Sequence, residues 1–230
     1  MRQDPFEALK AHDQALRERL QADAPGLRLC GVDEAGRGPL AGPVLAGAVV
    51  LPGDIRLPGL NDSKQLHGAQ RERLAGEIRR QAVAWATGRA EVEEIDTLGI
   101  RRATFLAMQR AVTGLEASAP DGTSGPDGTS GLYLLVDGRD FPFPGRRGSA
   151  LVRGDGQSAC VAAAGILAKV ERDAELVRLD AEFPGWGFAR HKGYGTAAHL
   201  ALLRERGRLP AHRRSFRLPW EKAPDELPFP

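Results

Sequence analysis

The sequence of 230 residues has little cysteine, no long apolar run and little net charge. Its two cysteines, Cys30 and Cys160, exclude a disulfide framework, and we interpret them as small buried hydrophobic residues in a reducing compartment. The longest apolar runs, such as Val44–Leu51, are too short to span a membrane. The N-terminus is charged and has no apolar segment, so no secretory signal peptide is expected. These absences predict a cytoplasmic globular protein.

The net charge of +2 conceals an uneven distribution. Residues 186–222 contain nine Lys/Arg and two Glu, so this segment carries +7 and the remainder of the chain −5. A basic segment beside an acidic remainder favours a polyanionic partner held against a carboxylate site. A solvated charged surface would explain the same distribution equally well.

The length and the hydrophobic content of 42% suit one domain with a substantial core. Hydrophobic periodicity predicts strands over 27–32, 44–51, 83–91 and 132–136, and helices over 6–21, 70–80, 93–116, 158–179 and 196–206. Loops are predicted over 141–153 and 183–195. The first two strands are joined by a short Gly/Pro-rich connection, which favours an antiparallel hairpin. Alternating strands and helices predict an α/β fold on a mixed sheet.

The chain divides into four predicted segments. They are an N-terminal helical extension over 1–26, a main domain over 27–185, a basic C-terminal segment of the same domain over 186–222, and a tail over 223–230. Residues 120–131 are the hexapeptide Pro-Asp-Gly-Thr-Ser-Gly written twice. That composition predicts a flexible surface loop, and the unit is too short for a repeat architecture.

Acidic residues follow two of the predicted strands. Asp33 and Glu34 follow the first strand and Asp137 follows the strand over 132–136, while Asp173 lies on the helix over 158–179. Carboxylates from separate elements form a site suited to Mg²⁺ or Mn²⁺, and two such ions can promote phosphodiester hydrolysis. Ordinary turn and cap acids are the alternative: Asp137-Gly138 alone is more often a turn than a ligand, and spacing does not establish that the strand ends meet.

Six blocks of the chain are similar, in order, to motifs of the type 2 ribonucleases H. They are residues 31–44 (GVDEAGRGPLAGPV), 61–66 (NDSKQL), 134–138 (LLVDG), 162–173 (AAAGILAKVERD), 191–196 (HKGYGT) and 209–216 (LPAHRRSF). The chain therefore resembles bacterial ribonuclease HII, which implies a ribonuclease H-like catalytic domain with a small C-terminal helical extension. Only about thirty residues precede the first block, which favours HII over HIII, a type that normally carries an extra N-terminal domain. Two departures, Gly165 in place of the usual Ser and the doubled hexapeptide, are not expected to touch the metal ligands.

The resemblance implies that Asp33, Glu34 and Asp137 are catalytic and bind two divalent ions, Mn²⁺ or Mg²⁺, during catalysis. Asp173 matches a fourth acidic, catalytic position. Because Lys169 precedes it by one helical turn, a structural ion pair is the alternative for Asp173.

The resemblance also implies how the substrate is bound. The backbone of Gly36, Arg37 and Gly38 would recognise a ribonucleotide 2′-hydroxyl, since glycine lets a backbone approach a ligand closely. Tyr194 would pack on the following deoxyribose; without the motif, a half-buried loop aromatic would be the preferred interpretation of this residue.

Several basic residues fit contacts to phosphates. Lys64, His191 and Lys192 would bind phosphates of the substrate, and Arg213 and Arg214 would add a nonspecific electrostatic grip. Unaided by the resemblance, Lys64, His191 and Lys192 would each be interpreted as an ordinary surface residue. Asp155 is interpreted as a loop acid.

The implied activity is that of a ribonuclease H acting on RNA–DNA hybrids and on DNA that contains ribonucleotides. It would cut 5′ to a single ribonucleotide embedded in duplex DNA, as in ribonucleotide excision repair, and leave 5′-phosphate and 3′-hydroxyl ends. A monomer is expected. Two alternatives stay open: a nuclease of the same fold that acts only on long hybrids, and a hybrid-binding module without catalysis.

Overall fold

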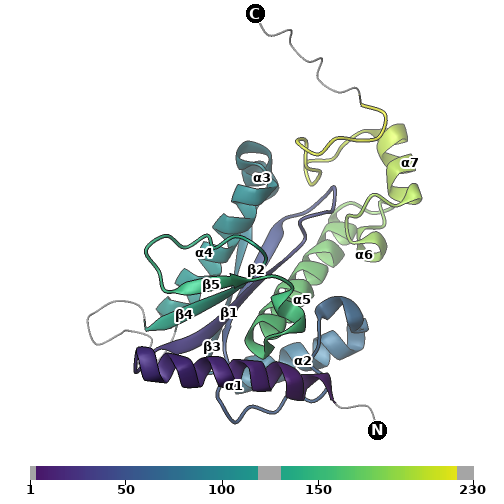
Figure 1. Ribbon diagram of the computed structural model, residues 1–230. Coiled ribbons are helices and arrows are strands. Elements are labelled where there is room, and N and C mark those ends of the chain that lie inside the picture. The colour runs from purple at the N-terminus through teal and green to yellow at the C-terminus, as the bar shows by residue number, and fades with distance from the viewer. Residues whose placement is uncertain (1–3, 119–130, 222–230) are drawn as a thin grey trace, which may run out of the picture.

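The computed structural model describes residues 4–118 and 131–221 and contains one mixed β-sheet (Figure 1). The strands are β1 (Arg28–Ala35), β2 (Val44–Val50), β3 (Ala84–Ala90), β4 (Leu132–Asp137) and β5 (Gly148–Leu151), in the order β3-β2-β1-β4-β5. β1 pairs antiparallel with β2 and parallel with β4, and β4 pairs parallel with β5. The predicted hairpin and the predicted mixed sheet are therefore confirmed.

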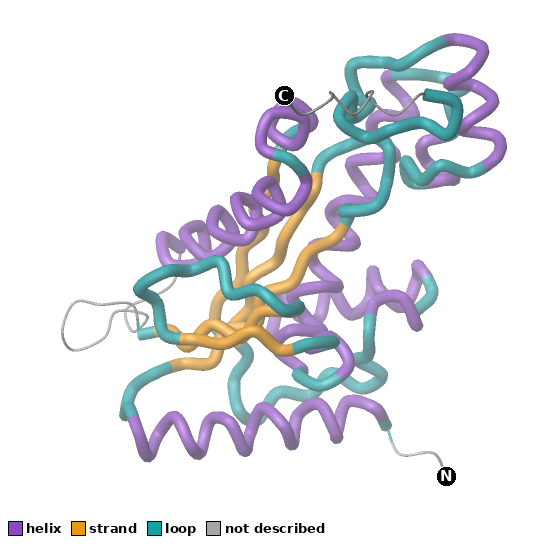
Figure 2. The backbone as a smooth tube through the Cα atoms, turned by 45° about the horizontal axis from the view of Figure 1, so that its top comes forward, coloured by secondary structure: helices purple, strands orange, loops and turns teal. Residues whose placement is uncertain are grey.

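Helices cover both faces of this sheet (Figures 1 and 2). They are α1 (Pro5–Asp23), α2 (Gly68–Gln81), α3 (Val92–Leu98), α4 (Ile100–Ser118), α5 (Ala159–Glu182), α6 (Phe188–His191) and α7 (Ala197–Arg206). α1, α2 and α5 share one hydrophobic core with the sheet, and α4 shares a second core with the opposite face. No helix in the described part of the chain is long and apolar enough to cross a membrane.

Three local predictions differ from the structure. The single helix predicted over 93–116 is wrong, because Gly99 adopts φ 76° and separates α3 from α4. The loop predicted over 141–153 contains β5, whose four residues lack the β-branched and aromatic side chains that mark a strand. The loop predicted over 183–195 contains the short helix α6.

Other local predictions are confirmed. α5 extends the predicted helix by three residues at its C-terminal end, and the Thr196 side chain caps α7 by accepting a hydrogen bond from the His199 backbone N–H. The predicted tail over 223–230 lies outside the described residues, as does the doubled hexapeptide except for Gly131.

α5 lies directly on β1 and β2 because two glycines leave room for its backbone. A Cβ at Gly31 would lie 2.2 Å from the carbonyl carbon of Cys160, and a Cβ at Gly47 would lie 2.3 Å from the carbonyl oxygen of Ala164. Real Cβ atoms do not approach backbone atoms so closely. These glycines therefore set the distance between α5 and the sheet.

The basic C-terminal segment folds back onto the connection between β1 and β2. The Gly42 N–H donates to the Ala211 carbonyl at 2.9 Å, and the Leu40 N–H donates to the Gly193 carbonyl at 2.8 Å. A separate apolar cluster joins this segment to the end of α5, where α6 and α7 lie (Figure 1). Residues 36–43 are consequently held between the sheet and the C-terminal segment.

Candidate active site

Three acidic side chains meet at one end of the sheet. β1 and β4 run parallel with Val32 opposite Val136, so the next residue of each strand, Asp33 and Asp137, lies at the same end of the sheet. One carboxylate oxygen from each of Asp33, Glu34 and Asp137 lies within 4.8 Å of the others. Asp33 is only 6% exposed, and the other two are partly buried. The structure thus brings together the three acids proposed as metal ligands.

The cluster is electrostatically strained when no cation is bound. Burial raises the pKa of Asp33 well above its usual range, and the charges of Glu34 and Asp137 raise it further. Burial is also the largest cause of the raised pKa of Glu34 and of Asp137. A divalent cation would relieve this repulsion, and a donor set made only of carboxylate oxygens fits Mg²⁺ or Mn²⁺.

Asp155 lies beside the cluster, a position that its interpretation as a loop acid did not predict. It is 7% exposed, and its charge raises the pKa of Asp33 and of Asp137, after the larger effect of burial on each. The preceding Gly154 N–H donates to Asp137 Oδ1 at 2.6 Å, and Lys64 Nζ donates to Asp155 Oδ2 at 3.1 Å. Asp155 is interpreted as a loop acid from the sequence because β5, the strand that leads into the turn over Gly154–Gly156, is not predicted.

Asp173 lies outside the group of three acids that could share a metal ion. It sits on α5, where Lys169 Nζ donates to its Oδ1 at 2.6 Å and Arg71 Nη2 lies 3.8 Å from its Oδ2. Two cations therefore compensate its charge without any metal. The structure favours the ion-pair interpretation of Asp173.

A cleft of about 240 Å³ opens over the acidic cluster. It is lined by Asp33, Glu34, Ala35, Gly36, Arg37, Gly38, Ser63, Lys64, Asp137, Lys169, Arg172 and Tyr194. Tyr194 is 48% exposed, and its ring lies 3.7 Å from where a Cβ on Gly38 would be. Most of the predicted substrate-binding residues, from three separate segments, therefore line one cleft.

The conformation and surroundings of Gly36 disfavour any side chain at this position. Its φ is +101°, which L side chains rarely adopt, and a Cβ would lie 2.0 Å from Arg172 Nε. The backbone N–H groups of Gly36, Arg37 and Gly38 donate no hydrogen bond within the described part of the chain. Three backbone donors are thus available at the cleft.

His191 and Lys192 do not line the cleft. The His191 ring is buried, with Nε2 2.8 Å from the Trp186 carbonyl and Nδ1 accepting from the Gly193 N–H at 3.1 Å. Lys192 Nζ donates to the main-chain carbonyl of Asp173 at 3.3 Å. Both ring nitrogens of His191 are therefore used inside the protein, which gives it a role in holding this loop.

Two further expectations from the sequence, on Arg213 and on Gly165, are corrected. Arg213 is 1% exposed, so it cannot contribute the surface grip on phosphates, whereas Arg214 is exposed. Gly165 does touch a proposed ligand, because a Cβ there would lie 2.2 Å from Asp33 Oδ2. Both results depend on contacts between distant segments, which spacing in the sequence does not reveal.

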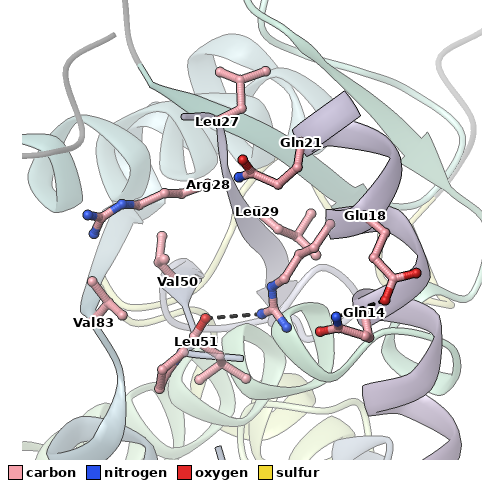
Figure 3. A pocket seen from close by; sticks show the side chains of 11 residues that line it. Gln14, Glu18, Gln21, Leu27, Arg28, Leu29, Val50, Leu51 and Val83 are labelled. Carbon is pink, nitrogen blue, oxygen red and sulfur yellow. Dashed lines mark hydrogen bonds between the residues drawn. The ribbon is translucent and has the colours of Figure 1, made fainter. Parts of the chain in front are cut away.

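A larger cavity lies at the opposite end of the sheet, between α1, the start of β1 and the end of β2 (Figure 3). It measures about 610 Å³. Its single acidic residue, Glu18, accepts a hydrogen bond from Gln14, and Arg17 donates to the Leu51 carbonyl. Without a group of carboxylates it offers no metal site, so the chemistry belongs to the smaller cleft.

Comparison with known proteins gives a consistent result. The model of the family Ribonuclease HII matches residues 30–223. The chain is 54% identical to a ribonuclease HII of Halorhodospira halophila, over 81% of this chain and 90% of that protein, and 49% identical to one of Nitrosococcus oceani, over 86% and 92%. The structure is similar to that of the PCNA:RNase HII complex from Archaeoglobus fulgidus, with a TM-score of 0.66 and 28% identity over 87% of this chain and all of that one.

Proposed function

The chain belongs to the ribonuclease HII family, whose members are metal-dependent endonucleases acting on RNA–DNA hybrids, and from this premise we propose that it cuts 5′ to single ribonucleotides in duplex DNA. The observation that carries this proposal is the lining of the cleft. Asp33, Glu34 and Asp137 line it together with residues 36–38, whose backbone N–H groups donate no hydrogen bond within the described part of the chain. A phosphodiester and the neighbouring 2′-hydroxyl could therefore be bound together.

Asp33, Glu34 and Asp137 would hold two divalent ions, Mg²⁺ or Mn²⁺, with Asp155 as a fourth acid beside them. When bound, these ions supply the positive charge that activates water and stabilises the leaving oxygen, which becomes a 3′-hydroxyl. Lys64 lies 3.1 Å from Asp155 and lines the cleft, where its ammonium can bind a substrate phosphate.

The backbone of Gly36, Arg37 and Gly38 would recognise the 2′-hydroxyl, the group that distinguishes RNA from DNA. The half-exposed Tyr194 ring, which lies over Gly38, would pack against the following deoxyribose. Lys192 would add a phosphate contact at the rim, and His191 would position the loop that carries Tyr194. We propose a monomer in the cytoplasm as the working form.

A labelled duplex with one ribonucleotide, compared with a matched duplex carrying four, tests the proposal. With Mn²⁺ or Mg²⁺ we expect cleavage 5′ to the single ribonucleotide, with 5′-phosphate and 3′-hydroxyl products, and no cleavage of the all-DNA control. Cleavage of the longer tract alone would contradict the junction specificity and favour the nuclease for long hybrids. Binding without cleavage of either duplex would favour a catalytically silent module.

Metal binding should be visible in the thermal stability of the protein. Asp33, Glu34 and Asp137 have raised pKa values in the folded state, so without metal the folded protein binds more protons than the unfolded chain. The free energy of unfolding therefore falls as the pH rises from the unfolded-state pKa values of these acids through their folded-state values. At pH 7 a Mn²⁺ concentration one hundred times its Kd should add about 2.7 kcal/mol, which raises Tm by roughly 5–10 °C.

The same thermal shift should be smaller at pH 5, because protons compete with the cation for the carboxylates. Differential scanning fluorimetry at the two pH values, with and without Mn²⁺, measures both effects. Asp140→Asn, which alters an exposed acid paired with Arg101, is the matched control and should keep the full shift. Equal shifts at both pH values, or none, would show that the cluster is not the metal site.

A further inference from the structure

Arg213 is a buried arginine that forms no salt bridge among the described residues, although the charge of Asp96 acts on it from farther away. Its side chain does not line the cleft, and its donors reach main-chain carbonyls of residues 36–43. Nε donates to the Gly42 carbonyl at 2.9 Å, Nη1 to those of Arg37 at 2.9 Å and Pro39 at 2.8 Å, and Nη2 to those of Gly36 at 2.6 Å and Pro43 at 3.2 Å. A guanidinium has five N–H donors, so every one is directed at this single loop.

These bonds fix the direction of the backbone donors at the cleft. In a planar trans peptide the C=O and the N–H point in opposite directions, and the described residues contain no cis peptide bond. The Gly36 carbonyl shares a peptide with the Arg37 N–H, and the Arg37 carbonyl shares one with the Gly38 N–H. Because Arg213 holds both carbonyls, both N–H groups point away from it.

Burial of an arginine without a carboxylate is costly unless all its donors are satisfied. Burial lowers the pKa of Arg213 to about 9, and the nearby charge of Arg172 adds to this effect. At neutral pH the group is still a cation and keeps all five donors. A side chain held in this way stabilises one conformation of the loop over 36–43, whereas a side chain that binds phosphates must be exposed.

Arg172 supports the same loop from the side of α5. Its Nη2 donates to the Ala41 carbonyl at 3.2 Å and its Nη1 to the Lys192 carbonyl at 3.1 Å. It thereby ties the 36–43 loop to the segment that carries Tyr194. Unlike Arg213, it holds no carbonyl of residues 36–38.

We propose that Arg213 is the positioning residue for recognition of the 2′-hydroxyl: by holding the carbonyls of Gly36 and Arg37, it aims the N–H groups of Arg37 and Gly38 at the ribose. This inference rests on the proposed function, in which the 36–38 backbone recognises that hydroxyl. Lysine cannot replace arginine here, because an ammonium has three donors on one nitrogen and cannot reach five carbonyls.

The test measures binding in an Asp137→Asn background, so that duplexes are not cut. Fluorescence anisotropy with Mn²⁺ gives the Kd for a duplex with one ribonucleotide and for the identical all-DNA duplex. We expect the parent to prefer the ribonucleotide by about tenfold or more. Arg213→Lys should reduce this preference to about twofold or less, while its exposed neighbour Arg214→Gln should weaken both duplexes equally and keep the ratio.

A preserved ratio in a folded Arg213→Lys variant, or an equal loss for both duplexes, would overturn the inference. The proposed function itself fails if the Asp137→Asn protein binds both duplexes equally and the unsubstituted protein does not cut the duplex with one ribonucleotide. Thermal unfolding establishes that each variant is folded.

If Arg213→Lys does not fold, Asp96→Ala provides a second test. The Asp96 carboxylate on α3 accepts hydrogen bonds from the backbone N–H groups of Arg214 at 2.9 Å and Ser215 at 2.8 Å. It anchors the segment that carries Arg213, and its hydrogen-bond partners among the described residues do not include residues 36–43. The preference for the ribonucleotide should fall in this variant too, and an unchanged preference would overturn the inference.

Discussion

Replacing Asp137 with asparagine is expected to lower metal-dependent cleavage by at least roughly 1,000-fold, which corresponds to about 4 kcal/mol of transition-state stabilisation. The substitution keeps the shape of the side chain, and its amide oxygen can still accept the Gly154 N–H. It removes one negative charge from a cluster whose oxygens lie within 4.8 Å of one another. Single-turnover cleavage of the single-ribonucleotide duplex in Mn²⁺ and in Mg²⁺ measures the loss. Unchanged cleavage would show that the metal assignment is wrong.

Two further substitutions decide which acid is the fourth member of the site. Asp155→Asn should lower cleavage about 10- to 100-fold, because Asp155 lies beside the cluster and orients Lys64. Asp173→Asn should leave the rate within about tenfold and act mainly on stability, because it breaks the ion pairs with Lys169 and Arg71. The reverse order of effects would restore Asp173 to the catalytic set.

The acids near the ends of β1 and β4 could be predicted because the change from apolar to acidic residues indicates where a buried strand reaches the end of the sheet. Asp33 and Asp137 each follow a run of buried residues, so the sequence places them at an edge of the sheet. That the two edges coincide is a matter of strand order, which spacing does not give. Asp155 could not be found in this way because β5 is short and only partly buried, and a Gly-Asp-Gly turn is typical of any loop.

The contacts of the basic residues were less predictable from the sequence than the positions of the acids. Arg213 and Arg214 are adjacent in the sequence, yet one is buried and the other exposed. The difference arises from a loop about 170 residues earlier, whose carbonyls surround Arg213. His191 likewise belongs to a packed group of rings with His199, which lies 4.1 Å away by ring centroids. The charge of a segment indicates a polyanionic partner, but it does not show which of its basic side chains contact that partner.

The largest expected effect on stability comes from Gly47→Ala. Its Cβ would lie 2.3 Å from the carbonyl oxygen of Ala164, and α5 must move because the contact is with backbone. Overpacking usually costs 1–3 kcal/mol, and a rigid backbone contact belongs at the upper end, so we expect a loss of about 3 kcal/mol or more. The Tm should then fall by roughly 6–12 °C, as measured by thermal unfolding. A loss below about 1 kcal/mol would show that α5 moves freely on the sheet.

Gly76→Ala is the matched control, because Gly76 lies exposed on α2 with nothing within 4 Å of its added Cβ, and it should stabilise the protein by about 0.5–1 kcal/mol. Gly47→Ala should also affect the site while the protein is still folded. Ala164 precedes Gly165, whose backbone contacts the Asp33 carboxylate, so a displaced α5 alters the packing of this ligand. Below its Tm, folded Gly47→Ala should therefore show a smaller thermal shift with Mn²⁺ than Gly76→Ala. An equal shift would mean that the acidic cluster is positioned by the strands alone.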